Sequence, residues 1–361
     1  MLERLWKRIL RRRTVSLWAL PALGLWICSL VYRLLFAIHR RLGPSPVKAP
    51  LYVVSVGNIA VGGTGKTSIV NLLGKYLLAD GYRVGIVSSG YGRRRQVTFT
   101  EPGHKVLQRE TQETGDEVKY LASLLPQAVF AVDRSKAVAV RHLADTGLVD
   151  VAIVDDGFQH HRLARDIDIV TYDGAVSERL MKPFPYGVLR EPVSALARAD
   201  VIIITRAKMA REPVQLRKKL HRISPRARLY LARFTLTELV GRDRRLPVKY
   251  LKDKSLLLFA GVGNFPALRR QVAALCATLD CALELSDHQR YTPDLLEKIK
   301  SAAARHNSDV IVTTGKDWVK LGDFDFGRET YYVVQSIDLD PGEENLMAFI
   351  EANVNSTKRP S

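Results

Sequence analysis

The stretch that decides the fold is "VGNIAVGGTGKTS", which runs from Val56 to Ser68. The apolar run "LYVVSV" precedes it, and "IVNLLGKYLLADG", which has the pattern of a helix, follows it. A strand, a glycine-rich turn and a helix in this order form a cradle for phosphate, because backbone N–H groups of the turn and of the helix N-terminus converge on anionic oxygens. Gly62, Gly63 and Gly65 permit that approach. The sequence therefore predicts a nucleotide-binding site.

Two side chains of this turn have predicted roles of their own. Lys66 is expected to reach the β- and γ-phosphates, and the Thr67 hydroxyl is expected to ligate Mg²⁺. The strict pattern has a glycine five residues before Gly65, where this chain has Ala60. The alternative is an ordinary glycine-rich turn. The predicted nucleotide-binding residues are Gly62, Gly63, Thr64, Gly65, Lys66, Thr67 and Ser68.

A pair of acidic residues follows another apolar strand. The segment "VAIVDDGFQHH" places Asp155 and Asp156 directly after four apolar residues. Carboxylates at a strand end hold Mg²⁺ in phosphoryl-transfer sites, directly or through water. We expect ATP rather than GTP as the nucleotide, because the guanine-reading Asn-Lys-x-Asp pattern is absent; "TTGKD" at 313–317 lacks the asparagine.

The rest of the chain alternates between strand-like and helix-like segments. Near-continuous Val/Ile runs such as "VAIV" and "VIIIT" suit a parallel sheet covered on both faces. The sequence therefore predicts a doubly wound α/β fold of the P-loop NTPase class with a second, smaller α/β domain. We expect strands at 51–56, 83–88, 127–132, 151–155, 167–172 and 200–205, and helices at 66–80, 116–125, 135–146, 266–279 and 295–306. The predicted domains are a P-loop domain at 46–228, a two-stranded linker at 229–250 and the smaller domain at 251–361.

The first 45 residues differ from the rest in composition. Residues 1–49 hold ten Lys/Arg against one acid, Glu3, and so carry half of the formal net charge of +18. These basic residues flank an 18-residue apolar run from Val15 to Tyr32, which is near the lower limit for spanning a bilayer. Because both ends are basic, the positive-inside rule places both in the cytoplasm. We expect residues 1–45 to lie along an anionic membrane surface as a helix, with a single span or a buried core helix as alternatives.

The basic charge does not indicate nucleic acid as a partner. Nucleic-acid-binding proteins carry their basic residues on a polar stripe, whereas the arginines here flank apolar, tryptophan-containing sequence. The three cysteines, Cys28, Cys276 and Cys281, show no metal-ligand spacing and are expected to be reduced thiols.

Several segments together resemble one known family. The segments "GNIAVGGTGKT", "SSGYGRR", "GDE", "DDGFQHHRLARDIDIV", "LREPVSALARADVIII", "AGVGNFP", "SDHQRY" and "TTGKDWVKL" occur in this order along nearly the whole chain. They closely resemble the tetraacyldisaccharide 4′-kinases, the lipid A kinases of Gram-negative envelopes. The resemblance implies a membrane-associated P-loop kinase at the cytoplasmic face of the bacterial inner membrane. It would move the ATP γ-phosphate to the 4′-hydroxyl of a tetraacylated glucosamine disaccharide 1-phosphate, forming lipid IVA, and we expect it to act as a monomer.

The resemblance also implies catalytic residues. It identifies Asp116 as the general base, oriented by His288, with Lys66 as the catalytic cation and Glu117 as a further residue near the metal. We expect Asp116 and His288 to lie in different domains and to pair only when the domains close. From the residues alone, Asp116 is equally well explained as a helix N-cap in "ETGDEVKYLASLL".

Further residues in the matched segments are expected to contact the substrate. An alternative for Arg134, Arg190 and Glu191 is a solvated surface ion pair, and Tyr91 either stacks on the sugar or packs within the protein. The predicted substrate-binding residues are Tyr91, Arg134, Gln159, His160, Arg190 and Glu191.

The chain departs from the family pattern at several positions. Ser89 replaces the arginine of the Ser-Arg-Gly-Tyr-Gly loop, and the arginines at 93–95 are candidates to replace it. Val118 replaces a proline and Gly315 replaces a glutamate. These departures concern the acceptor side of the site and leave the nucleotide motif intact.

A second function class shares the P-loop. A membrane-bound P-loop ATPase switch with no lipid acceptor also combines Gly-Gly-x-Gly-Lys-Thr with a membrane-seeking helix. The two hypotheses differ in where the phosphate goes, to a lipid or only to water.

Overall fold

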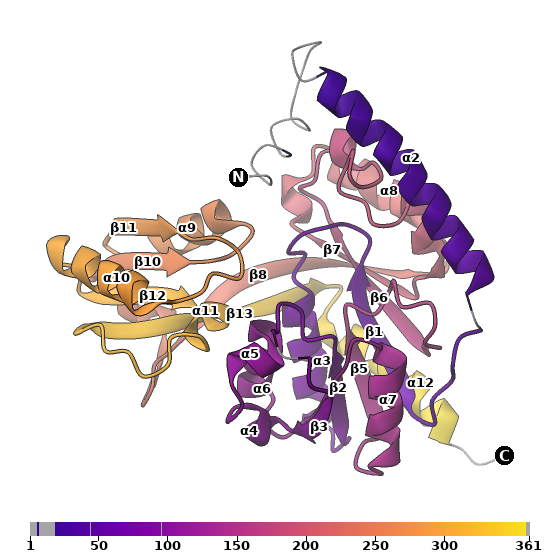
Figure 1. The fold of residues 1–361 in the computed structure, drawn as a ribbon, viewed down its shortest axis with the longest axis horizontal. Helices are drawn as coiled ribbons and strands as arrows, with labels where there is room; N and C mark the ends of the chain where they lie inside the picture. The colour runs from indigo at the N-terminus through magenta and orange to yellow at the C-terminus, as the bar shows by residue number, and fades with distance from the viewer. Residues whose placement is uncertain (1–5, 7–18, 44, 95, 359–361) are drawn as a thin grey trace. The chain divides into compact units, whose positions relative to one another are not determined.

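The computed structural model describes residue 6 and residues 19–43, 45–94 and 96–358 (Figure 1). By its internal contacts the chain divides into two compact units, each built from separate segments of the sequence. Unit 1 comprises Met1–Lys66, Val154–Ala232 and Leu339–Ser361, and unit 2 comprises Thr67–Ile153 and Arg233–Asp338. The domain boundaries expected from the sequence follow chain order, whereas these units do not, and the domain assignment stays a prediction.

Unit 1 is organised around parallel strands. Strand β1 (Tyr52–Asn58) pairs with β6 (Ile167–Asp173), which pairs with β7 (Val201–Thr205), which pairs with the first half of β8 (Arg228–Val240). All three pairings are parallel. Every residue of β1, β6 and β7 is buried, as a sheet covered on both faces requires.

Helical segments cover the strands of unit 1. Helix α8 (Pro213–Ile223) places Leu220 and the 3₁₀ segment η2 (Val193–Arg198) places Leu196 against Val170 of β6 and Ile202 of β7. Helix α12 (Glu343–Lys358) buries a stripe that includes Leu346, Met347, Ile350 and Val354. Unit 1 also holds the helical elements α2 (Ala19–Leu42), η1 (Glu178–Leu180) and η3 (Ala207–Met209).

Unit 2 contains a second set of parallel strands. Strand β10 (Ser255–Ala260) lies between β11 (Thr278–Glu284) and β12 (Val310–Thr314), and β12 pairs with β13 (Glu329–Asp340); all three pairings are parallel. Alternate residues of β10 face opposite sides: Leu256 and Leu258 pack with α9 (Phe265–Ala273), and Leu257 and Phe259 pack with α10 (Pro293–Arg305). Helices on both faces of parallel strands are what the sequence predicts for this region.

The same unit holds the segments that follow the P-loop. Strand β2 (Val84–Ser88) pairs in parallel with β4 (Val129–Val132), and β3 (Phe99–Pro102) pairs antiparallel with β4. The helices of this part are α3 (Lys66–Ala79), α4 (Gly103–Val106), α5 (Thr111–Thr114), α6 (Asp116–Leu124) and α7 (Lys136–Asp145), and β5 (Val151–Asp155) follows them.

The expected strands and most expected helices are confirmed within two residues. The predicted two-stranded segment at 229–250 is the antiparallel pair of β8 and β9 (Arg245–Pro247), followed by η4 (Val248–Leu251). The helix expected at 266–279 is wrong at its C-terminal end: α9 ends at Ala273, because the chain turns so that Thr278 can pair with Ser255.

Helix α2 is the long, indigo helix of Figure 1 and belongs to unit 1. It holds 24 residues and includes most of the predicted apolar run; residues 15–18 of that run lie outside the described residues. In the part of the chain that the structure describes, no helix is both long enough and apolar enough to cross a membrane.

Candidate functional site

The glycine-rich turn is fixed to the ends of two strands in unit 1. The Asn58 side-chain amide donates to the Thr64 hydroxyl (3.1 Å), which shares a hydrogen bond with the Thr171 hydroxyl (2.7 Å). Thr171 in turn donates to the Gly57 carbonyl (3.1 Å). Thr64 is buried and bonded to residues of β1 and β6, so its hydroxyl holds the shape of the turn, and its contact with nucleotide stays a prediction.

The glycines of the turn have conformations that other residues adopt rarely. Gly62 has φ = +120° and Gly65 has φ = +85°, and a Cβ at Gly62 or Gly63 would meet no heavy atom within 4 Å. Gly62 and Gly65 are thus needed for the backbone path, and open space lies beside Gly62 and Gly63. Helix α3 begins at Lys66, which leaves its first N–H groups without intrahelical partners and available for an anion.

Lys66 is joined to the acidic pair predicted at the end of β5. Its ammonium nitrogen lies 3.3 Å from Oδ1 of Asp156, and Arg190 donates from Nη1 to Oδ2 of the same carboxylate (2.8 Å). Asp156 has φ = +52°, a strained conformation for a non-glycine residue that aims its side chain at these two cations. Asp155, the last residue of β5, is buried. Three predicted site residues, Lys66, Asp156 and Arg190, thus form one cluster, which we call the lysine cluster.

Two further predicted residues, Gln159 and Glu191, are hydrogen-bonded in the segments next to this cluster. Gln159 donates to the Asn58 carbonyl (2.6 Å) and to Oε1 of Glu191 (3.1 Å). Glu191 is buried and accepts two hydrogen bonds from Arg198 (3.0 and 3.2 Å), whose guanidinium lies 4.4 Å from the ring centre of Phe158. The alternative of a solvated surface ion pair is therefore wrong for Glu191, because its carboxylate is enclosed by its partners.

The predicted catalytic pair is assembled in unit 2. His288 donates from Nδ1 to both carboxylate oxygens of Asp116, at 3.0 Å (Oδ2) and 3.3 Å (Oδ1). The expectation that they lie in different domains and pair only on closure is wrong, because both residues belong to unit 2 and are already in contact. The Tyr91 ring, which is mostly exposed, lies with its centre 5.1 Å from the His288 ring centre. We call Asp116, His288 and the residues around them the aspartate cluster; these are Tyr91, Glu117, Lys316, Asp317 and Lys320.

Asp116 is the first residue of α6 rather than its N-cap. The N-cap is Gly115, with φ = +83°, and Asp116 accepts a hydrogen bond from the backbone N–H of Glu117 (3.0 Å). A Cβ at Gly115 would lie 2.9 Å from the Tyr91 carbonyl oxygen, so only glycine lets this helix start so close to the Tyr91 loop. The N-cap interpretation of Asp116 is therefore wrong.

Sequence reasoning missed two lysines of the aspartate cluster. Lys320 lies 3.5 Å from Asp116 Oδ2 and 3.0 Å from Oδ1 of Asp317, which is fully buried, and Lys316 forms an ion pair with Glu117. Both lysines come from the segment "TTGKDWVKL", which includes α11 (Gly315–Trp318). Their place in a segment shared with the family was the available signal.

The charges around Asp116 and His288 favour an ion pair. Burial alone would raise the pKa of Asp116, but the hydrogen bond from His288, with the positive charges of His288, Lys320 and Lys316, outweighs it and lowers that pKa. The hydrogen bond to Asp116 raises the pKa of His288 above its ordinary value. Asp116 is thus kept ionised, the form that can accept a proton.

Other predicted residues lie apart from these contacts. Arg134 is exposed, and His160 is half-buried, with its carbonyl accepting from Arg165 (2.8 Å). Of the arginines proposed to replace the one missing at Ser89, Arg93 is buried and donates to the Val97 carbonyl, Arg94 is exposed, and residue 95 lies outside the described residues. The Ser68 hydroxyl lies 3.4 Å from the Gln335 side chain.

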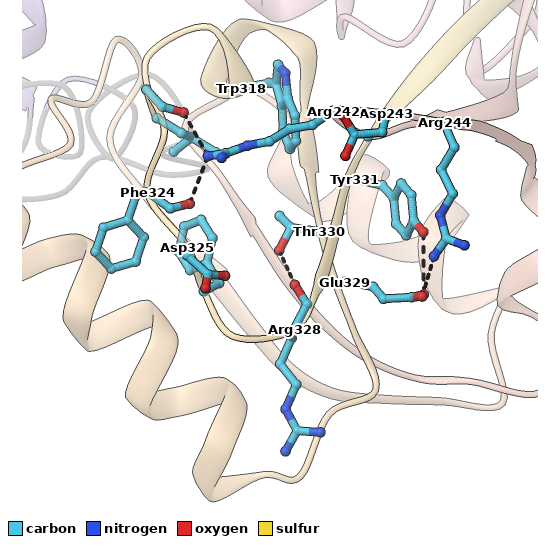
Figure 2. A pocket seen from close by; sticks show the side chains of 14 residues that line it. Arg242, Asp243, Arg244, Trp318, Phe324, Asp325, Arg328, Glu329, Thr330 and Tyr331 are labelled. Atoms are coloured by element: carbon cyan, nitrogen blue, oxygen red, sulfur yellow. Dashed lines mark hydrogen bonds and ion pairs between the residues drawn. The ribbon is translucent and has the colours of Figure 1, made fainter.

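Unit 2 also contains a pocket of about 380 Å³ (Figure 2). Its arginines are already bound to protein: Arg242 donates to the carbonyls of Gly322 and Phe324, and Arg244 pairs with Glu329. None of the predicted site residues lines it. The pocket therefore contributes nothing to the candidate site.

The comparisons with known proteins identify the family. The family described as tetraacyldisaccharide-1-P 4′-kinase matches residues 21–355. Tetraacyldisaccharide 4′-kinases from Pelobacter propionicus and Syntrophus aciditrophicus are 35% and 34% identical to this chain, over 81% and 86% of it and over 80% and 90% of their own lengths.

A solved structure agrees with the sequence relatives. LpxK from Aquifex aeolicus in complex with ATP superposes with a TM-score of 0.74 at 27% identity, covering 92% of this chain and 99% of that one. This likeness confirms the α/β P-loop fold expected from the sequence. It also makes the alternative of an ATPase switch without a lipid acceptor the less favoured one. The chain belongs to the tetraacyldisaccharide-1-P 4′-kinase family.

Proposed function

We propose that this chain transfers the terminal phosphate of ATP to the 4′-hydroxyl of a tetraacylated glucosamine disaccharide 1-phosphate, and so forms lipid IVA. The observation that carries the proposal is the contact of His288 with Asp116, at 3.0 Å. A P-loop is common to kinases and to ATPase switches, whereas an ionised carboxylate held by a histidine can accept the proton of an acceptor hydroxyl. Family membership supplies the identity of that acceptor.

On the nucleotide side, the lysine cluster is arranged for a triphosphate. In the structure Lys66 contacts Asp156, while Arg190 holds the other oxygen of that carboxylate. When ATP enters, we infer that Lys66 turns to the β- and γ-phosphates and that Asp156 retains Arg190 as its partner. The N–H groups of residues 62–68 bind the phosphate oxygens.

Mg²⁺ is the proposed metal, with Thr67, Asp155, Asp156 and Glu117 as candidate ligands. Among the described residues no three His, Cys, Asp or Glu side chains gather at one point, so the fit rests on a hydroxyl, carboxylates and the phosphates themselves, the hard oxygen donors that Mg²⁺ prefers. Glu117 is engaged by Lys316 and would have to exchange that partner. When bound, Mg²⁺ neutralises charge on the β- and γ-phosphates.

The proton of the acceptor is proposed to go to Asp116. As the 4′-oxygen forms its bond to the γ-phosphorus, the bond from that phosphorus to the β,γ-bridging oxygen breaks and ADP leaves. The 4′-hydroxyl proton passes to the Asp116 carboxylate late in this step. His288 keeps the carboxylate oriented, and Lys320 supplies a second positive charge at 3.5 Å.

Substrate contacts are proposed for the exposed members of the predicted set. Tyr91 presents a largely exposed ring beside His288, which suits stacking on a sugar. Arg134 is exposed to solvent, and its guanidinium suits a phosphate. His160 is a weaker candidate, because it is partly buried. Gln159, Arg190 and Glu191 are held by protein contacts, so we propose that they act by shaping the nucleotide side.

We propose that α2 lies on the anionic cytoplasmic face of the bacterial inner membrane, and that the enzyme acts there as a monomer. Its exposed large apolar side chains are Leu20, Leu23, Trp26, Ile27, Leu30, Val31, Leu34, Leu35, Ile38 and Leu42. A contiguous apolar face of this size is rare on a soluble surface and suits insertion into a leaflet. The excess of Lys and Arg in the sequence of residues 1–49 favours an anionic surface.

Mass spectrometry of the lipid after incubation with Mg-ATP tests the proposal. Wild-type protein should add one phosphate to the non-reducing sugar of the disaccharide. ATP consumption with unaltered lipid would contradict it and restore the ATPase switch.

A further inference from the structure

The face of α2 opposite to its apolar surface is directed at the protein. Ala22 and Ser29 are buried, and Leu25, Tyr32 and Phe36 are partly buried. These positions recur every three or four residues and therefore form one narrow stripe along the helix. The stripe includes a tyrosine hydroxyl, whose bonding partner belongs to the lysine cluster.

Tyr32 connects α2 to Arg190. Its hydroxyl donates to the Arg190 carbonyl (3.0 Å). Its ring stacks on Phe36, with centres 6.2 Å apart, and meets Phe184 edge-on at 6.3 Å. Burial raises the pKa of Tyr32, so the hydroxyl keeps its proton and remains a donor.

The segment around Arg190 is bound to the backbone of the P-loop. The Arg190 N–H donates to the Ile59 carbonyl (2.8 Å), and the Val61 N–H donates to the Val188 carbonyl (2.7 Å). From the same residue the guanidinium reaches Asp156, the partner of Lys66. A shift of Arg190 would therefore move both the path of the P-loop and the carboxylate beside its lysine.

A second contact lies one helical turn further along α2. The Phe36 ring meets the His161 ring edge-on, with centres 5.8 Å apart. His161 Nε2 lies 3.7 Å from Glu191, the buried carboxylate that also accepts from Gln159. Tyr32 thus contacts Arg190, and Phe36, four residues further along α2, contacts His161.

We propose that Tyr32 is a positioning residue through which docking of α2 on an anionic bilayer tightens the binding of Mg-ATP. The proposal rests on the membrane association proposed above for α2. A bilayer that holds the apolar face of α2 fixes the stripe against the Arg190 segment, and nucleotide binding is favoured in the state with that segment fixed. One hydroxyl–carbonyl bond can transmit a change of about two- to tenfold in affinity.

Coupling of this kind is reciprocal. If the bilayer tightens nucleotide binding by a given factor, bound nucleotide must tighten vesicle binding by the same factor. A residue that merely stabilises the fold would weaken both events without linking them.

The test uses the full chain and vesicles of phosphatidylethanolamine and phosphatidylglycerol. The affinity for a fluorescent, non-hydrolysable ATP analogue with Mg²⁺ is measured with and without vesicles, for wild type and Tyr32→Phe. Wild-type affinity should rise about two- to tenfold on the vesicles. Tyr32→Phe keeps the ring contacts and should still sediment with vesicles, but its nucleotide affinity should no longer respond. Tyr250→Phe, which removes a tyrosine hydroxyl bonded to Glu329 in unit 2, is the matched control and should respond as wild type does.

The results of these measurements distinguish the coupling through Tyr32 from the proposed kinase function. A wild-type affinity that ignores vesicles, or a Tyr32→Phe variant that keeps the full response, would overturn the coupling even if the lipid is phosphorylated normally. Vesicle binding tightened by nucleotide in wild type but not in Tyr32→Phe would support it. Failure of wild type to phosphorylate detergent-dispersed disaccharide would instead overturn the proposed function.

Discussion

The lysine cluster of unit 1 and the aspartate cluster of unit 2 are built in different ways. Lys66 is the first residue of α3 and follows directly on a turn that is held by hydrogen bonds among Asn58, Thr64 and Thr171. Asp116 and His288 are 172 residues apart and are held by side-chain contacts, with Lys320 as a further partner. A local turn of the chain places Lys66, and ion pairs with Asp156 complete the first cluster. The second cluster has no such turn and depends on side chains from segments far apart in the sequence.

One feature is common to both clusters. Asp156 in the first and His288 in the second have φ = +52° and φ = +56°, conformations that cost energy in a non-glycine residue. In each cluster the strained residue is the one that aims an ionisable side chain at its partner. The difference in construction then predicts different responses to mutation: single side-chain changes should disable the aspartate cluster while leaving the nucleotide site in place.

The largest expected effect is on Asp116. Asp116→Asn keeps the size of the side chain and removes the proton acceptor, so kcat should fall about 10²- to 10⁴-fold. Affinity for Mg-ATP, measured by equilibrium binding, should be unchanged because the nucleotide site is built separately. Asp309→Asn, at a surface carboxylate that accepts from Ser255, is the control and should keep the wild-type rate. A near wild-type rate for Asp116→Asn would remove Asp116 from the role of base.

A smaller loss is expected at Lys66. Lys66→Met removes one charge that stabilises the transferring phosphate, and kcat/KM should fall about 10²- to 10³-fold. Here the affinity for ATP should fall too, which separates this variant from Asp116→Asn. Lys75→Met, an exposed lysine of the same helix, provides the control. If Lys66→Met bound and used ATP normally, the assignment of the P-loop would be wrong.

These two clusters also differ in how far the sequence predicts them. "GGTGKT" between a strand and a helix is a local pattern, so the site of Lys66 and the Asp155–Asp156 pair follow from contiguous residues. The contact of Gln159 with Glu191 and the contact of Tyr32 with Arg190 join residues 32 and 158 positions apart in the sequence, so they depend on how separate segments pack and no local pattern predicts them.

The aspartate cluster shows the limit of reading from local pattern. Alone, "ETGDEVKYLASLL" allowed Asp116 to be a cap or a base, and only the family resemblance linked it to His288. We expected the two residues to lie in separate domains. They lie in one unit because unit 2 is built from two separate parts of the sequence, 67–153 and 233–338. Chain order is a poor guide where a compact unit is discontinuous.

Gly315, beside the aspartate cluster, is packed closely against an aromatic ring. A Cβ at this position would lie 1.9 Å from Cε2 of Tyr120, whose ring meets Tyr332 edge-on. Gly315→Ala should therefore lower the free energy of unfolding by about 1–3 kcal/mol, measured by urea denaturation.

A double-mutant cycle separates the clash from other effects of the methyl group. In a Tyr120→Leu background, Gly315→Ala should cost far less, because the atom it meets is gone. Gly263→Ala is the control, since the nearest atom to its Cβ is 4.0 Å away. Equal costs of Gly315→Ala in both backgrounds would contradict the packing explanation.

The smallest expected effect is the pH dependence of the pair formed by Asp116 and His288. The hydrogen bond to Asp116 raises the pKa of His288 in the folded protein. The stability that His288 contributes is therefore fully present below the pKa of histidine in the unfolded chain, about 6.5, and is lost as pH rises through the folded pKa. The pKa of Asp116 is lowered despite burial, so its contribution is present above about pH 4 and is lost as pH falls through the folded pKa. The pair therefore stabilises the fold most between these limits.

His288→Gln removes the charge partner while keeping a polar side chain. Because His288 is about a third exposed, the loss near pH 6 should be only about 0.5–1 kcal/mol in the free energy of unfolding. That gap between wild type and variant should narrow as the pH rises through the raised pKa of His288, because the wild-type imidazole then loses its charge. His306→Gln, at an exposed histidine, should show no such narrowing. A gap that stays constant as the pH rises would mean that His288 supports Asp116 by packing rather than by charge, and the aspartate cluster would then differ from the lysine cluster, whose contacts are ion pairs.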